Sequence, residues 1–91
     1  MKAKDNAEDL EEIALRLSNL YLEQERFDEV LKFEEQDIDN VLTKWNIARA
    51  YQALEQTTAA LERYRLLLSD LKENPEFLEQ YIYLLREMGD F

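Results

Sequence analysis

The chain has 91 residues, enough for one domain, and 46% of them are hydrophobic, so a buried core is feasible. A formal net charge of −10 would repel a nucleic-acid backbone or an anionic membrane surface, and the absence of Cys and His removes disulfides, thiol chemistry and the usual transition-metal ligands. With one Gly and one Pro among many good helix formers, the composition predicts an all-α fold.

The N-terminal part of the chain predicts two helices after a flexible polar lead-in, residues 1–7. Asn6 can cap the first helix, and apolar side chains then recur at helical spacing through "LSNLY". Leu15 and Leu22 form a flanking stripe, and the turn "QERF" precedes a short second helix over residues 28–35. The expected core face of the first helix consists of Leu10, Ile13, Ala14, Leu17, Leu20 and Tyr21.

A second pair of helices follows the acidic segment "EEQDIDN". Either Asp39 or Asn40 can cap the third helix, because both side chains offer an oxygen to its free N–H groups. The segment "EQTT" then separates it from a fourth helix, for which Thr57 or Thr58 is the expected cap.

The segment "KENPEF" predicts the start of a fifth helix. Asn74 is the expected cap, and Pro75 suits the first helical position because its missing N–H would be unsatisfied there in any case. The segment "MGDF" predicts the end of this helix. Five helices joined by short turns predict consecutive antiparallel hairpins, which we place in one domain over residues 8–91.

An internal repeat relates these hairpins. Three positions of the first helix align with three of the third at an offset of 30, and three of the fifth continue the series at an offset of 34. The three units begin near residue 11, residue 41 and residue 75, so the last, 75–91, is partial. The aligned sets are Leu17, Ser18 and Tyr21, then Ile47, Ala48 and Tyr51, then Tyr81, Ile82 and Leu85.

The middle unit, residues 41–74, resembles the tetratricopeptide repeat family. That family places a small residue in each helix of a hairpin, aromatics beside them and a Pro at the end. Here Ala48 and Ala60 would let the two helices approach closely, and Tyr51 and Tyr64 would fill the space beside the crossing. The pattern departs from the family at the usual turn glycine, which only the last unit retains, and in the position of its Trp.

This resemblance implies a right-handed solenoid of stacked hairpins, and we expect the chain to be a piece of a longer bacterial repeat protein. The fifth helix carries apolar residues with no sixth helix after it. It either caps the array or continues into a further repeat; a face left uncovered would favour self-association as a homodimer.

Catalysis is not expected from this sequence. Adjacent carboxylates on a helix point apart, the acidic turn lacks the spacing of a calcium loop, and no glycine-rich phosphate loop is present. We therefore expect no enzymatic activity, no cofactor and no metal. Without an apolar run long enough for a bilayer or a signal peptide, the expected location is the cytoplasm.

The resemblance instead implies a binding groove lined by the first helix of each hairpin. Trp45 could equally belong to the core, Leu15 and Leu22 could pack beneath a neighbouring helix, and Arg49 and Arg86 could simply be solvated charges. The residues expected to face the groove are Leu15, Asn19, Leu22, Trp45, Arg49, Gln52, Glu79, Tyr83 and Arg86.

The groove can be tested against the way some related co-chaperones hold an acidic chaperone tail. The matching positions here are Leu15, Asn19, Asn46, Glu76 and Gln80, so both amides are present and the basic residues are missing. Charge-assisted bonds supply the affinity in that mode, which we reject. We expect a protein or peptide ligand with apolar anchors and some basic residues, and neither nucleic acid nor membrane. The alternative is a structural spacer or self-association module.

Overall fold

The computed structural model describes residues 5–36 and 38–89, with side chains from Leu10 onward. Within these ranges the chain forms five α-helices and one 3₁₀ helix and no strand. The predicted all-α fold of helical hairpins is therefore confirmed. The elements are α1 (Asp5–Glu23), α2 (Phe27–Leu31), η1 (Lys32–Gln36), α3 (Val41–Ala53), α4 (Thr57–Leu71) and α5 (Pro75–Glu87).

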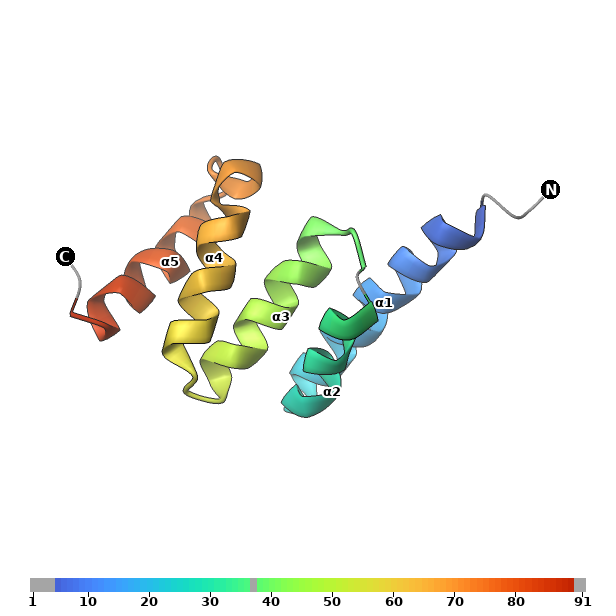
Figure 1. Ribbon diagram of the computed structural model, residues 1–91, viewed down its shortest axis with the longest axis horizontal. Coiled ribbons are helices and arrows are strands. Elements are labelled where there is room, and N and C mark those ends of the chain that lie inside the picture. The colour runs from blue at the N-terminus through green and yellow to red at the C-terminus, as the bar shows by residue number, and fades with distance from the viewer. Residues whose placement is uncertain (1–4, 37, 90–91) are drawn as a thin grey trace.

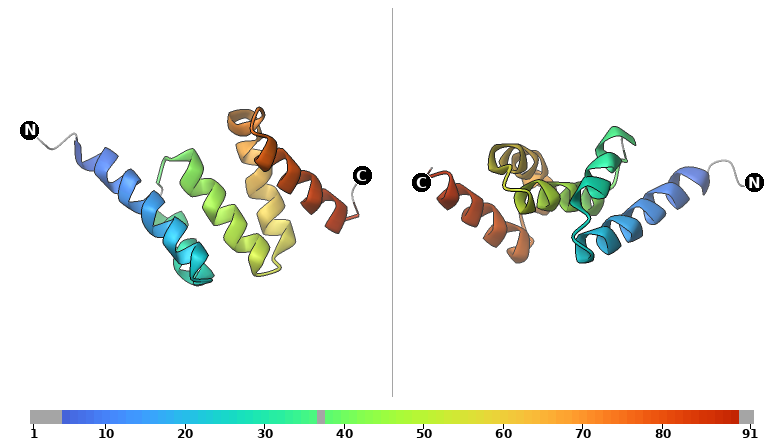
Figure 2. Two further views of the ribbon diagram at one scale, coloured as in Figure 1. Left: turned by 180° about the vertical axis from the view of Figure 1, so that it is seen from behind. Right: turned by 90° about the horizontal axis from the view of Figure 1, so that it is seen from below.

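The helices stack in two layers. The first helices of the three units, α1, α3 and α5, run side by side with a common tilt, and α2 and α4 lie on one side of them (Figures 1 and 2). Helix α3 packs against both α1 and α4, so it joins one hairpin to the next. We call α1, α3 and α5 the first-helix layer and α2, η1 and α4 the second-helix layer.

Two of the predicted helix caps are present. The Asn40 side chain accepts a hydrogen bond from the Thr43 backbone N–H at 3.0 Å, which selects Asn40 over Asp39 as the cap of α3. The Asn74 side chain accepts one from the Phe77 backbone N–H at 3.1 Å, with Pro at the first position of α5. Each cap satisfies one of the N–H groups that a helix start leaves free.

Other predicted boundaries are wrong. Helix α4 begins at Thr57, and its cap is Gln56, whose carbonyl accepts the first helical bond from Ala60 N–H at 3.0 Å; both threonines therefore lie inside the helix. Asn6 is likewise not a cap, because α1 already includes Asp5 and Asn6 lies inside it. Residues 1–4 of the expected lead-in lie outside the described residues. The predicted second helix is split into α2 and η1, because the chain tightens into a 3₁₀ turn before the linker to α3.

The hairpin turns repeat at the level of the backbone. Glu25 and Glu55 have φ of 60° and 63°, and Gly89 has φ of 71° at the corresponding place after α5. After α3, the Gln56 N–H bonds to the Tyr51 carbonyl at 2.9 Å and the Glu55 N–H to the Gln52 carbonyl at 3.0 Å, and the same two bonds close the turn after α1. This is the Schellman pattern, in which a left-handed residue ends a helix. Two glutamates thus occupy positions that favour glycine.

The core is divided into two clusters that share α3. One cluster joins α1, α2, η1 and α3 around Ala14, Val30, Phe33, Ile47 and Ala50. The other joins α3, α4 and α5, and it contains Trp45, Ala48, Ala60, Leu61, Tyr64, Leu67, Leu71, Phe77 and Leu84. The two alanines predicted at the helix crossing are fully buried in this second cluster, which agrees with close approach of α3 and α4.

The two outer helices keep apolar side chains exposed. On α1, the predicted core face is divided: Ala14 is buried, whereas Leu10, Ile13 and Leu20 are exposed. On α5, Ile82 and Met88 are exposed while Leu84 and Phe77 are buried. The physical reason is that each outer helix has a neighbour on one side only, so one stripe of its apolar residues remains uncovered.

Candidate functional site

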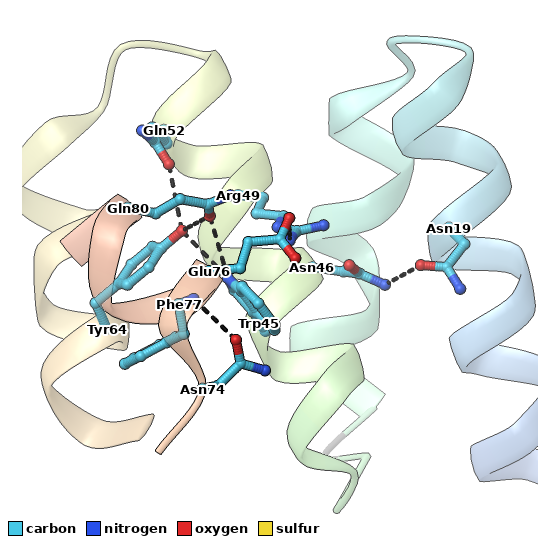
Figure 3. A network of polar contacts seen from close by, with 10 residues as sticks. All are labelled: Asn19, Trp45, Asn46, Arg49, Gln52, Tyr64, Asn74, Glu76, Phe77 and Gln80. Atoms are coloured by element: carbon cyan, nitrogen blue, oxygen red, sulfur yellow. Dashed lines mark hydrogen bonds and ion pairs between the residues drawn. The ribbon is translucent and has the colours of Figure 1, made fainter. Parts of the chain in front are cut away.

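Two sets of polar contacts lie along the first-helix layer: one joins α1 to α3, and the other joins α3 to α5 (Figure 3). The members that link the three helices are Asn19, Asn46, Arg49, Glu76 and Gln80, and we call them the polar network. A buried polar group is costly unless it is hydrogen-bonded, so the bonds of the buried Asn46 side chain to α1 fix the position of α3 relative to that helix.

Asn46 connects α3 to α1. Its side chain is buried, and Nδ2 donates to Ser18 Oγ and to Asn19 Oδ1, both at 2.8 Å. Ser18 is also fully buried and donates to the Leu15 carbonyl at 2.9 Å, so it is satisfied within its own helix. Asn19 is exposed, and its amide group is held at the surface by this contact.

Trp45 and Tyr64 connect α3 and α4 to α5. The Tyr64 hydroxyl donates to Gln80 Oε1 at 2.7 Å, and the indole Nε1–H of Trp45 is shared between Tyr64 Oη and Gln80 Oε1, both at 3.3 Å. Gln52 Oε1 lies 3.3 Å from the same hydroxyl. Burial raises the pKa of Tyr64, although the Trp45 hydrogen bond and the nearby positive charge oppose it. The phenol therefore keeps its proton at neutral pH and remains a donor.

Arg49 lies at the middle of the layer and is held on two sides. Its guanidinium carbon is 4.2 Å from the centre of the Trp45 ring, and one terminal nitrogen is 3.3 Å from Glu76 Oε2 (Figure 3). Its Nε is buried and, among the described residues, has no hydrogen-bond partner. A cationic side chain that has a fixed position and is 30% exposed is a candidate point of contact for a ligand.

Trp45 itself offers little surface to a ligand. It is 5% exposed, and its ring packs edge-on against Phe77 with centroids 5.5 Å apart. Of the two readings that the sequence left open, this placement agrees with the core. The face of its indole packs against the Arg49 guanidinium, so Trp45 contributes to the first-helix layer by holding Arg49 in position.

The other expected groove residues fall into two groups. Leu15 and Leu22 are half-buried, and Leu22 packs on the core cluster between α1 and α3. Glu79, Tyr83 and Arg86 are exposed on α5, and among the described residues none of the three side chains forms a hydrogen bond or ion pair with the polar network.

Gln52 and Tyr83 meet at one end of the layer. Both line a shallow hollow of about 590 Å³ where α3 ends, α4 begins and α5 ends. Tyr83 is 55% exposed, so its ring is available beside the Gln52 amide. The structure thus brings together two residues that are 31 positions apart in the sequence.

Three members of the network were not among the expected groove residues: Asn46, Glu76 and Gln80. The sequence did contain a signal for them, because all three occupy positions matched to the acidic-tail binding mode. Because the basic residues of that binding mode are absent, the sequence does not favour these three residues as groove residues. The structure shows a different use, in which Asn46 bonds to α1, and Glu76 and Gln80 bond to α3.

The described residues contain no group of three or more acidic side chains placed to hold a metal ion. None of the described helices combines the length and apolar character required to cross a membrane.

Stacked antiparallel hairpins that meet at small residues, with aromatics beside the crossing, define a tetratricopeptide-type helical repeat. The model of the family described as YpiA-like, C-terminal tetratricopeptide repeats matches residues 42–91, more than half of the chain, and the chain belongs to this family. Neither a curated protein nor a solved structure matches it significantly. Tetratricopeptide repeats are generally non-catalytic modules that mediate interactions between proteins.

Proposed function

We propose that this chain binds a peptide or helical segment of a partner protein along the first-helix layer. The observation that carries the proposal is the placement of Arg49: it stacks on Trp45, pairs with Glu76 and keeps part of its guanidinium exposed between α1 and α5. A ligand lying across the layer would meet a preorganised side chain at the centre, which lowers the entropic cost of binding.

The chemistry of the layer favours a ligand with apolar anchors and basic residues. Asn19 and Gln52 are amides that can bond to the main chain of a bound segment, and Tyr83 offers an exposed ring to an apolar side chain. Glu76 and Glu79 are exposed on α5, so basic side chains would find acidic partners there. A ligand carboxylate would instead have to displace Glu76 from Arg49.

The experiment is selection of peptides from a random displayed library on this chain, followed by NMR titration of the isotope-labelled chain with the selected peptide. Amide signals of Asn19, Arg49 and Tyr83 should shift together. The Kd should weaken about tenfold for Tyr83→Ala, since loss of an aromatic anchor is expected to cost about 1–2 kcal/mol. Lys72→Ala, at the end of α4, is the matched control and should leave the Kd unchanged. A chain that serves only as a spacer would show no localised response to any selected peptide.

A second candidate function is self-association through α5. Ile82 is 52% exposed on a helix whose outer side has no neighbour among the described residues, and Met88, the residue after this helix, is also exposed. Sedimentation at several concentrations should show a dimer that dissociates on dilution, and Ile82→Glu should abolish it. A monomer at every concentration would exclude this candidate while leaving peptide binding unaffected.

A further inference from the structure

A second hollow lies in the second-helix layer, on the side of α3 that does not hold the polar network. It has a volume of about 470 Å³ and is formed by η1, the linker to α3, α3 and α4. Figure 1 looks onto this side, with α2 and η1 on one side of α3 and α4 on the other. The apolar part of its lining consists of Phe33, Ile38, Ile47, Leu66 and Leu67. None of the residues expected to face the groove contributes to it.

The hollow exists because the second helices of the first two units, α2 with η1 and α4, differ in length. Helix α4 has 15 residues, whereas α2 has five and η1 a further five before the linker. With the two units aligned at an offset of 30, residues 68–70 of α4 fall on residues 38–40 of the linker and have no helical counterpart in the first unit. Three residues of α-helix span about 4.5 Å, so the first hairpin is nearly one helical turn short beside the end of α4.

This shortfall leaves apolar surface uncovered. Leu66 is 79% exposed, the highest value among the large hydrophobic side chains of the described residues. Its neighbour Leu67 is buried in the core cluster, and Phe33 of η1 also lines the hollow. A full-length second helix in the first hairpin would lie beside this surface. A helical turn supplied from outside would fit the same position.

The rim of the hollow selects the charge of such a segment. Arg63 donates to Glu34 at 2.8 Å, and the Lys44 ammonium lies 3.5 Å from Asp39, so both cations on the rim already have carboxylate partners. Asp70, on the last part of α4, forms no hydrogen bond or ion pair with any other described residue. An incoming basic side chain would find this carboxylate available, whereas an acidic one would meet a rim with more carboxylates than cations.

We propose that this hollow docks an amphipathic helical segment of a partner protein, one that presents a large aliphatic side chain to Leu66 and a Lys or Arg to Asp70. The segment replaces the turn that the first hairpin lacks. This site is separate from the first-helix layer, so one chain can hold two partner segments on opposite sides of α3.

The test uses a synthetic amphipathic helical peptide with a Leu and a Lys four residues apart on one face, matching Leu66 and Asp70 on α4, titrated into the isotope-labelled full chain. The amides of Ile38, Leu66 and Asp70 should shift. The Kd should weaken about tenfold for Leu66→Lys, which removes the apolar contact and adds a repelling charge, and about threefold for Asp70→Asn. Because Leu66 is mostly exposed, its substitution should leave the circular dichroism spectrum unchanged. Ile82→Lys on α5 makes the same change of charge and should leave this Kd unaltered.

Four outcomes would overturn the proposal. These are a response confined to Asn19, Arg49 and Tyr83, equal binding of the peptide with Glu in place of Lys, an unchanged Kd in Leu66→Lys, and no response at all. A shift of the Leu66 signal on dilution of the chain alone would identify a second copy as the occupant and would likewise reject a basic partner segment. The groove test above uses different residues, so either proposal can fail without the other.

Discussion

Replacement of Phe77 by Ala should detach α5 from the rest of the molecule. Phe77 is fully buried and lies among three aromatic rings, with centroids 5.0 Å from Tyr64, 5.5 Å from Trp45 and 6.3 Å from Tyr81. Loss of a buried Phe costs about 3–5 kcal/mol, and the three aromatic contacts place this site towards the upper end. The free energy of unfolding of a chain of this length is only about 5–14 kcal/mol.

The loss should fall on one helix, because a helix at the end of a stacked array has a neighbour on one side only. Besides Phe77, the only fully buried large side chain of α5 is Leu84, and one such residue is a weak basis for docking 13 residues of helix. Hydrogen exchange should therefore show loss of protection across α5, while the amides of Ile47 and Ala50 in α3 remain protected by the other core cluster.

A control variant and the pattern of hydrogen exchange test this prediction. Tyr83→Ala removes an exposed ring from the same helix and should change the free energy of unfolding by about 0.5 kcal/mol or less. If Phe77→Ala instead lowered protection equally in α1, α3 and α5, the array would unfold as one unit, and the argument that α5 is held only through its own contacts would be refuted.

Three further predictions follow from local geometry. Glu55→Gly should raise the free energy of unfolding by about 0.5–1 kcal/mol in denaturant titrations, because φ of 63° strains a residue with a Cβ; Glu55→Ala, which removes the carboxylate but keeps the Cβ, should give no gain. Asn74→Ala should lower it by about 1 kcal/mol, since it removes the cap of α5; an unchanged midpoint would show that the cap is dispensable. Burial raises the pKa of Glu34, but hydrogen bonds from Arg63 and Tyr51 and the Arg63 charge outweigh it and lower the pKa from 4.5. The stabilisation is therefore present above pH 4.5 and is lost as the pH falls through the lowered pKa. Unfolding of Glu34→Gln against the parent should show a difference at pH 7 that shrinks below pH 4, and a constant difference would contradict the assignment.

Much of the scaffold could be predicted because it depends on local chemistry. An Asn followed by Pro marks the start of α5, and two alanines mark where α3 and α4 cross. The start of α4 could not be predicted in the same way. It is set by the left-handed turn at Glu55, and a glutamate gives no sign of that conformation in the sequence.

The candidate site was less predictable, because its residues acquire their positions from packing between helices. Trp45 has the spacing of either a core or a groove residue, and only its contacts with Phe77 and Tyr64 decide between them. Glu76 and Gln80 lie on a helix whose rotation about its own axis is fixed by Phe77 and Leu84. The hollow beside Leu66 depends on how far α4 extends past η1, which is a relation between two hairpins.

The contacts of α3 also bear on how stiff the array is. On one side, Asn46 ties α3 to Ser18 and Asn19 of α1; on another, the Tyr51 hydroxyl and Arg63 both donate to Glu34 of η1, at 2.7 Å and 2.8 Å. A bend that opened one side would stretch the bonds there, and the opposite bend would stretch the other set. Bending of the array in either direction should therefore be resisted by one of the two sets of hydrogen bonds, which would keep the curvature of the molecule close to that of the structure.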